Sequence, residues 1–198
     1  MIPVTPPALS TPMNVFLDFE ASSLSKFSYP IEVAWVFEDG TSEAHLIQPA
    51  PQWTEWDEEA QAVHHITRQT LQDDGAPHDV VARRIVEQLS GHNLFASAPS
   101  WDGKWLSALL RAAKLPRHAL RLRDSEDARA EAARAILAPV VSAEHLHVEI
   151  ADLLALVEVR RANGQPAHRA LADAQDEQQH WLDVVSEAKA VAKKRARI

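Results

Sequence analysis

The sequence contains no cysteine among its 198 residues and only five glycines. The lack of cysteine excludes disulfide bonds and thiolate metal sites, and it is compatible with the cytoplasmic location that we predict. The glycines form no phosphate-binding loop and no dinucleotide-binding fingerprint. A Gly-x-Ser-x-Gly nucleophile elbow is also missing. These absences remove several common enzyme classes.

Long apolar runs and an excess of basic charge are absent as well. No run approaches the roughly 20 residues of a membrane span, and residues 1–12 lack the regions that make a signal peptide. The formal net charge of −8 argues against a protein that coats duplex nucleic acid, although it allows an enzyme that handles a short strand end. With 46% hydrophobic and 24% charged residues, the composition is that of a soluble globular protein.

The order of predicted elements indicates a single domain over residues 1–198, with an extended lead-in at 1–12 and a basic helix end at 183–198. Strands are predicted over residues 14–19, 31–37, 41–48, 93–97 and 119–123. Helices are predicted over residues 57–63, 67–71, 77–90, 101–113 (capped by Ser100), 125–137, 143–162 and 169–198. This order matches an α/β architecture with a ribonuclease H-like mixed β-sheet of about five strands, three antiparallel first, flanked by α-helices.

One predicted strand, Val15–Glu20, carries two acids within an apolar run. Because side chains alternate along a strand, Asp18 and Glu20 point the same way, roughly 6.6 Å apart. Ionised carboxylates near a core cost several kcal/mol each unless something compensates them. A bound cation is the obvious compensator, so the strand predicts a metal site that later residues complete.

Two later acids are candidate ligands for the same site. Asp102 begins a predicted helix, and taken alone it is explained as well by the favourable helix dipole. Asp173 follows His168 by five residues, which puts them about 140° apart on a regular helix. They converge only if His168 lies on the turn after Pro166 and Asp173 lies inside the helix. A histidine there suits a general base, because the ordinary histidine pKa lies near neutrality. For an isolated His168, a solvent-exposed helix start is the simpler explanation.

Together these motifs resemble the DEDDh family of 3′–5′ exonucleases over about residues 14–182. The Asp18-Phe19-Glu20 run resembles the first family motif, and Trp101-Asp102 resembles the second. The stretch 168–174 matches the third motif, His-x-Ala-Leu-x-Asp-Ala, closely. The stretch 63–67 resembles a substrate-side segment that is usually Val-His-Gly-Ile-Thr, but His65 stands in place of the glycine. After the first motif, Ala21-Ser22-Ser23 stands where Thr-Thr-Gly is frequent.

The resemblance implies an exonuclease that releases nucleoside 5′-monophosphates from the 3′ end of single-stranded nucleic acid, with RNA slightly favoured over DNA. It implies that two Mg²⁺ or Mn²⁺ ions are held by Asp18, Glu20, Asp102 and Asp173, and that His168 deprotonates the attacking water. The residues expected at the substrate are Ala21, Ser22, Leu24, His65, Ile66, Trp101, Lys104 and Arg169. For Leu24 and Trp101, ordinary core packing is an equal alternative. A homodimer is expected by analogy alone.

Two other functions remain open at this point. A catalytically inactive nucleic-acid-binding or scaffold protein could have the same fold, although the complete ligand set counts against it. A zinc-dependent hydrolase would need a histidine cluster, for which the candidates are His64, His65, His145 and His147. The sequence has no His-Glu-x-x-His motif, and neighbouring histidines on one element diverge, which disfavours the zinc enzyme.

Overall fold

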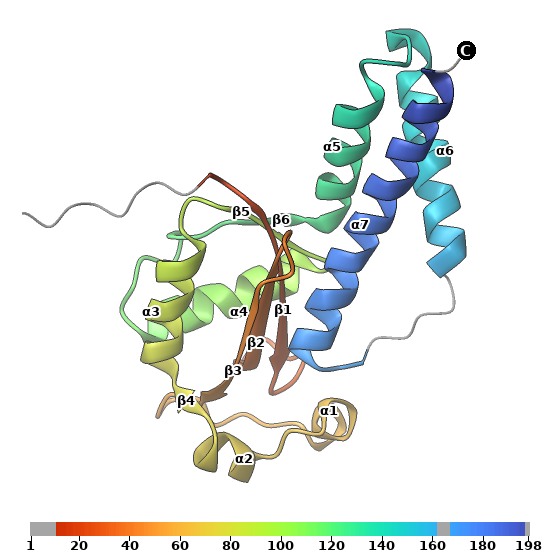
Figure 1. The fold of residues 1–198 in the computed structure, drawn as a ribbon. Helices are drawn as coiled ribbons and strands as arrows, with labels where there is room; N and C mark the ends of the chain where they lie inside the picture. The colour runs from red at the N-terminus through yellow and green to blue at the C-terminus, as the bar shows by residue number, and fades with distance from the viewer. Residues whose placement is uncertain (1–10, 162–166, 197–198) are drawn as a thin grey trace, which may run out of the picture.

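The computed structural model describes residues 11–161 and 167–196, and their centre is a mixed β-sheet (Figure 1). The sheet has six strands in the order β4-β3-β2-β1-β5-β6. They are β1 (Asn14–Ala21), β2 (Pro30–Phe37), β3 (Ser42–Gln48), β4 (Ala76–Pro77), β5 (Asn93–Ala96) and β6 (Leu122–Asp124). The first three form an antiparallel meander whose β2–β3 turn contains Gly40 at φ 89°. The predicted mixed sheet with three antiparallel strands first is therefore confirmed.

Strand β1 is the boundary between the two halves of this sheet. It pairs antiparallel with β2 along its whole length, from Val15 to Ala21. On its other side it pairs parallel with β5, but only over residues 14–16. The second half of β1, which carries Asp18 and Glu20, therefore has a neighbouring strand on one side only.

Two predicted boundaries were wrong. The last strand lies at Leu122–Asp124 rather than 119–123, and the two-residue strand β4 was not predicted. The helix after β5 begins at Pro99, with Ala98 as an N-cap that makes no side-chain hydrogen bond, so Ser100 is not the cap. Proline suits the first helical turn because its missing N–H would have no partner there.

Helices cover both faces of the sheet. They are α1 (Glu58–His64), α2 (Arg68–Asp73), α3 (His78–Leu89), α4 (Pro99–Ala112), α5 (Ser125–Leu137), α6 (Ala143–Arg161) and α7 (Ala170–Arg195). Helices α3 and α4 pack on one face, and α7 crosses β1 and β2 on the other (Figure 1). Alternation along β1 sends Val15, Leu17 and Phe19 into the core beneath α3 and α4. Residues 16, 18 and 20 therefore face α7.

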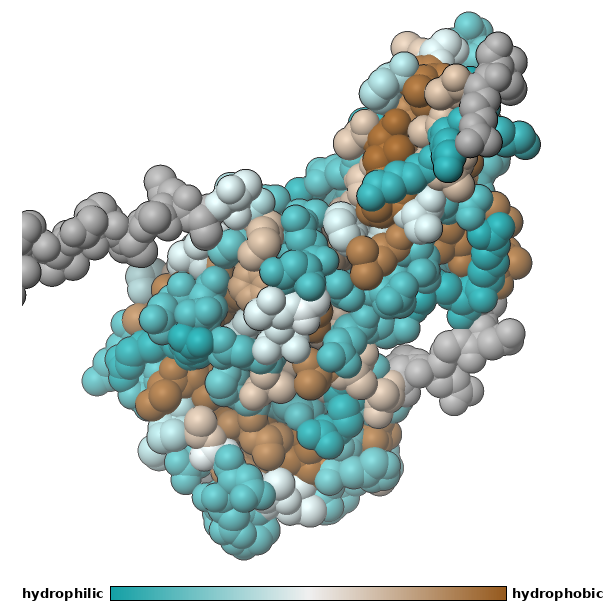
Figure 2. Space-filling view, in the orientation of Figure 1, coloured by the Kyte–Doolittle hydropathy of each residue, from teal (hydrophilic) through white to brown (hydrophobic). Residues whose placement is uncertain are grey.

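Helix α7 has 26 residues, about 39 Å at the usual rise, and it runs past the sheet to join α5 and α6. We call α5, α6 and the distal part of α7 the helical extension. It has a core of its own, which includes Leu137, Leu153 and Val184. Apolar side chains also reach its surface (Figure 2), and on α6 they include Val148 and Val159. None of the described helices combines the length and the apolarity needed to cross a membrane.

Candidate metal centre

Strand β1 and helix α7 bring three carboxylates together. Asp18 and Glu20 lie on the face of β1 that α7 covers, and Asp173 lies in the first turn of α7. One carboxylate oxygen of each residue lies within 4.8 Å of the others. Within the described ranges, no other set of three acidic or histidine side chains gathers in this way. The two-residue spacing thus puts Asp18 and Glu20 on one face of β1, and α7 brings Asp173 to them. The sequence predicted this convergence for the three acids.

The electrostatics of these groups favour a bound proton or cation. Burial raises the pKa of Asp18 well above its usual value, and the charges of Asp102, Glu20 and Asp173 raise it further. Burial also raises the pKa of Glu20 to about 7, again with a contribution from Asp173. Carboxylate oxygens are hard ligands of the kind that Mg²⁺ and Mn²⁺ prefer. The three carboxylates therefore fit such an ion.

Asp102 lies close to this group without being part of it. Its side chain is only 2% exposed, and its charge is the largest Coulombic contribution to the raised pKa of Asp18. Burial raises the pKa of Asp102 itself to about 7, while hydrogen bonds with the backbone at Ala98 and Phe19 lower it. Asp102 is thus within electrostatic reach of Asp18, but not within the 4.8 Å set.

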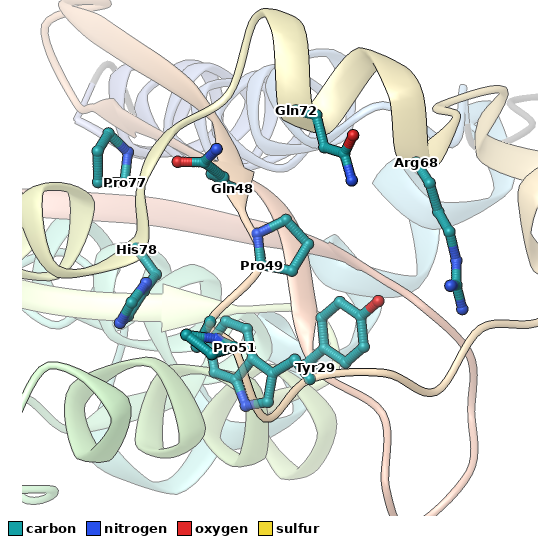
Figure 3. A pocket seen from close by; sticks show the side chains of 10 residues that line it. Tyr29, Gln48, Pro49, Pro51, Arg68, Gln72, Pro77 and His78 are labelled. Carbon is teal, nitrogen blue, oxygen red and sulfur yellow. The ribbon is translucent and has the colours of Figure 1, made fainter.

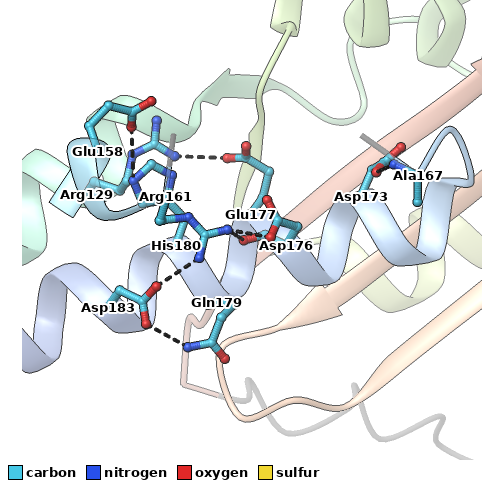
Figure 4. A network of polar contacts seen from close by, with 10 residues as sticks. All are labelled: Arg129, Glu158, Arg161, Ala167, Asp173, Asp176, Glu177, Gln179, His180 and Asp183. Carbon is cyan, nitrogen blue, oxygen red and sulfur yellow. Dashed lines mark hydrogen bonds and ion pairs between the residues drawn. The ribbon is translucent and has the colours of Figure 1, made fainter. Parts of the chain in front are cut away.

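His168 lies on the turn that leads into α7. It has a left-handed backbone at φ 53°, and the helix begins two residues later, so Asp173 is helical while His168 is not. The backbone N–H of Ala167 donates to Asp173 Oδ1 at 2.7 Å (Figure 4). His168 and the three carboxylates line one cavity of about 460 Å³. With five residues from His168 to Asp173, the two side chains can converge only if His168 lies on the turn and Asp173 lies in the helix, which is the arrangement found.

The helical extension supplies another wall of this cavity (Figure 4). Arg129 pairs with Glu177 at 2.9 Å, and Arg161 pairs with Asp183 at 2.8 Å and also with Asp176. The wall residues on the extension are Glu158, Arg161, Asp176, Glu177 and His180. We did not predict them, although Glu177 and His180 follow Asp173 by four and seven residues, the spacing of one helix face.

A second cavity, of about 450 Å³, shares Glu20 and His168 with the first. Ala21 and Leu24, both predicted at the substrate, line it, and Leu24 is 69% exposed. The other lining residues are Phe19, Ser23, Asp57, Glu59, Ala60, Val63, His64 and Trp105. The second cavity is therefore mixed in polarity and opens directly beside the carboxylates.

The segment at 63–67 contributes to this cavity through residues that we did not predict. His65 has φ 59° and forms the left-handed C-cap of α1, which is a position that favours glycine. It lines neither cavity, whereas its neighbour His64 lines the second. Ile66 is 3% exposed and packs in a core cluster with Tyr29 and Leu71. Neither His65 nor Ile66 thus lines one of the two cavities, and their predicted contact with the substrate stays a prediction.

Three polar side chains that we expect at the substrate make hydrogen bonds or ion pairs with other residues of the protein. Ser22 is buried and donates to Glu55 at 2.7 Å. Lys104 Nζ donates to the Ser25 carbonyl at 2.6 Å and to Ser28 Oγ at 3.0 Å. Arg169 forms a two-pronged ion pair with Glu32 on β2.

The Trp101 ring lies 5.6 Å from the ring of Trp105, with Lys104 Nζ 4.8 Å from its centroid. Trp101 lines neither cavity. These contacts connect Ser22, Lys104 and Arg169 to the loop after β1 and to the start of α7, and the predicted substrate contacts of these residues and of Trp101 stay predictions.

The histidines proposed for zinc do not assemble within the part of the chain that the structure describes. His64 is buried, and its Nδ1 accepts a hydrogen bond from the Ile66 backbone at 3.0 Å. His145 and His147 lie on α6, where Ser142 Oγ contacts His145 Nδ1. The zinc-hydrolase alternative is therefore without a site there.

A further cavity, of about 630 Å³, lies on the side of β3 and α2 (Figure 3). Its lining residues are Tyr29, Gln48, Pro49, Ala50, Pro51, Trp53, Arg68, Gln72, Pro77 and His78. It contains no carboxylate, and Trp53 already stacks on Tyr29 at a ring distance of 5.2 Å. Size alone thus does not identify the chemical site.

No family model matches the sequence, and no curated protein matches it significantly. Solved structures do resemble it. The zinc-bound E. coli ExoI–ssDNA complex is 18% identical, with a TM-score of 0.59, over 95% of this chain and 42% of that chain. E. coli Exonuclease I in complex with a dA16 oligonucleotide is 16% identical, with a TM-score of 0.63, over 92% and 42% of the two chains.

A moderately thermophilic Exonuclease I from Methylocaldum szegediense is 18% identical, with a TM-score of 0.62, over 92% of this chain and 42% of that chain. At such low identity, the likeness shows the fold, which is the ribonuclease H-like fold that the element order predicted. The chain spans about two fifths of the length of these structures.

Proposed function

We propose that this protein is a metal-dependent 3′–5′ exonuclease that hydrolyses single-stranded nucleic acid from its 3′ end and releases nucleoside 5′-monophosphates. The observation that carries the proposal is the convergence of Asp18, Glu20 and Asp173 beside His168, at the mouth of a second cavity. The likeness in fold to Exonuclease I supports it. The proposed enzyme comprises a single domain.

In this proposal Asp18, Glu20 and Asp173, together with Asp102, would hold two Mg²⁺ or Mn²⁺ ions. When bound, the ions would activate the attacking water and stabilise the leaving oxygen. His168 would accept the proton of that water, since it lines the same cavity as the three carboxylates. The raised pKa values of Asp18 and Glu20 support the binding of cations, because a cation compensates the burial of the two charges.

The second cavity is the proposed site of the terminal nucleotide. Its apolar lining by Leu24, Val63 and Trp105 would contact the base, while Glu20 and His168 connect it to the chemistry. A single cavity of about 450 Å³ favours one unpaired nucleotide over a duplex end. The similar solved structures include complexes with ssDNA. The slight preference for RNA that we inferred from the sequence remains a prediction.

A product ladder tests the proposal directly. A 5′-labelled single-stranded oligonucleotide, prepared as DNA and as RNA, is incubated with Mg²⁺ and the wild-type protein, with Asp18→Asn as the matched control. We expect one-nucleotide shortening from the 3′ end by the wild type and none by Asp18→Asn. Binding of both oligonucleotides without any shortening would favour the inactive binding protein instead. Equal cleavage of DNA and RNA would remove the RNA preference.

The predicted homodimer also remains a proposal by analogy. Sedimentation equilibrium of the purified chain measures it, and a mass near 22.0 kDa at all concentrations would contradict it.

A further inference from the structure

A buried glutamate beside the candidate site has no role in the proposed chemistry. Glu32 lies on β2 opposite Glu20 of β1, and it is 4% exposed. Its carboxylate accepts three hydrogen bonds: from Arg169 Nε at 3.1 Å, from Arg169 Nη2 at 2.7 Å and from the Ala170 backbone N–H at 3.0 Å. These three donors bind Glu32 to the start of α7.

The contact with Ala170 replaces a missing helix cap. Ala170 is the first residue of α7, and its N-cap Arg169 makes no side-chain capping bond. The first N–H groups of a helix have no acceptor within the helix, and a negative charge near them is favourable. Glu32 supplies both the acceptor and the charge from a different element, 138 positions away in sequence.

The same contacts surround His168. Its left-handed backbone, φ 53°, costs a residue other than glycine about 1–2 kcal/mol, so neighbouring contacts must maintain it. On one side, the Ala167 N–H donates to Asp173. On the other side, Arg169 and Ala170 donate to Glu32. The turn is therefore fixed both before and after His168.

We propose that Glu32 is a positioning residue that holds His168 and Asp173 against the carboxylates of β1. This inference rests on the proposed function for its effect on catalysis, but not for its effect on the turn. The Arg169 side chain is 52% exposed, and a solvent-exposed ion pair contributes little net stability, so stability alone does not account for the arrangement. Loss of Glu32 would release the turn, and His168, the proposed base, and Asp173, a proposed metal ligand, would be displaced together.

The molecule contains a matched control for this ion pair. Glu43 on β3 accepts from Arg84 Nε at 3.0 Å and from Arg84 Nη2 at 2.6 Å, which is the same two-pronged geometry between a strand and a helix. Neither Glu43 nor Arg84 lines the carboxylate cavity or the second cavity. Glu43→Ala therefore measures the loss of a strand–helix ion pair without the loss of the turn.

Two measurements on the full chain test the inference. The first is backbone hydrogen exchange without metal, in which we expect the Ala170 amide to be protected in the wild type and in Glu43→Ala, and unprotected in Glu32→Ala. The second is exonuclease kinetics, in which we expect Glu32→Ala to lower kcat by about 100-fold with KM changed less than about threefold. Glu43→Ala should stay within about threefold of the wild type. Glu32→Gln, which keeps an acceptor for Ala170, should be intermediate and serves if Glu32→Ala fails to fold.

Combination with His168→Ala separates positioning from simple destabilisation. If Glu32 acts through His168 and Asp173, Glu32→Ala/His168→Ala should lose much less activity than the product of the two single losses. The inference would be overturned if the double variant lost as much activity as the product of the two single losses. It would also be overturned if the kcat of Glu32→Ala equalled that of Glu43→Ala. If the wild type cleaves nothing, the proposed function fails, and the protection of Ala170 in Glu32→Ala still decides whether Glu32 holds the turn.

Discussion

Carboxylates near the candidate site fall into two groups with opposite environments. On the helical extension they are neutralised by arginines: Glu177 pairs with Arg129, Glu187 pairs with Arg160, and Asp183 pairs with Arg161. On the sheet side, none of the ion pairs within the described residues includes Asp18, Glu20 or Asp102. The first group is neutralised within the chain, whereas the second has no ion-pair partner among the described residues.

The comparison shows that, within the described ranges, these arginines pair with the carboxylates of the helical extension and leave those of the sheet group unpaired. Helix α7 carries both kinds of carboxylate, since Asp173 in its first turn joins the sheet group and Asp183 further along pairs with Arg161. Burial raises the pKa of Glu20 and of Asp102 to about 7, even though the charge of Arg169 lowers the pKa of Glu20. The carboxylates on the sheet side are thus buried groups that a cation or a proton from solution would neutralise.

The largest effect should come from removing a carboxylate of the sheet group. We expect Asp18→Asn to lower exonuclease activity by at least about 1,000-fold, because the site loses a ligand and part of its charge. The same change should raise the melting temperature of the metal-free protein, because it removes a costly buried charge. Single-turnover cleavage and calorimetry measure the two effects. A melting temperature that falls in the absence of metal would contradict the comparison.

Loss of the proposed base should come next. We expect His168→Ala to lower kcat by about 100-fold to 10,000-fold and to leave Mn²⁺ affinity within about threefold, because His168 is not one of the three clustered ligands. Isothermal titration with Mn²⁺ and single-turnover kinetics test this. A large loss of Mn²⁺ affinity would instead make His168 a ligand.

The stability of the metal-free protein should depend on pH in a defined direction. Because the native pKa of Glu20 is about 7, well above its usual value of 4.5, the folded state keeps a proton that the unfolded chain has released. The free energy of unfolding should therefore fall as the pH rises from about 4.5 to about 7.

For Glu20 we expect the free energy of unfolding to fall by at least about 1 kcal/mol over this pH range, which corresponds to about 2–4 °C in Tm. Glu20→Gln should lose this part of the slope, and Mg²⁺ should raise the Tm more at pH 8 than at pH 5. A wild type and a Glu20→Gln variant with equal slopes would be the contrary result.

The smallest effect should come from an ion pair of the extension. Arg160 and Glu187 lie 2.6 Å apart, with the arginine side chain 57% exposed. Because solvent screens such pairs, Arg160→Ala should cost only about 0.2–1 kcal/mol of unfolding free energy and should not change cleavage. Urea denaturation and the product ladder measure this. A drop in activity as large as that of His168→Ala would show that the two groups of carboxylates are not independent.

The sequence was informative where the determinants are local. The spacing of Asp18 and Glu20 fixes their common face through strand alternation, and the five-residue spacing of His168 and Asp173 limits where α7 begins. The partners of the polar side chains could not be predicted in this way. Lys104 meets Ser25 across 79 positions, and Arg169 meets Glu32 across 137. Only the packing of the sheet brings such pairs together, so these contacts could not be predicted from the sequence, and the substrate contacts of both residues stay predictions.

The short pairing between β1 and β5 has a consequence for the shape of the site. Because that ladder stops after Phe16, the rest of β1 has no neighbouring strand on this flank among the described residues. The sheet is thus open on one side of Asp18 and Glu20, while β2 pairs with β1 on the opposite side. A longer β5 would cover this flank, so the length of that one strand determines how open the backbone is beside the two carboxylates proposed to bind metal.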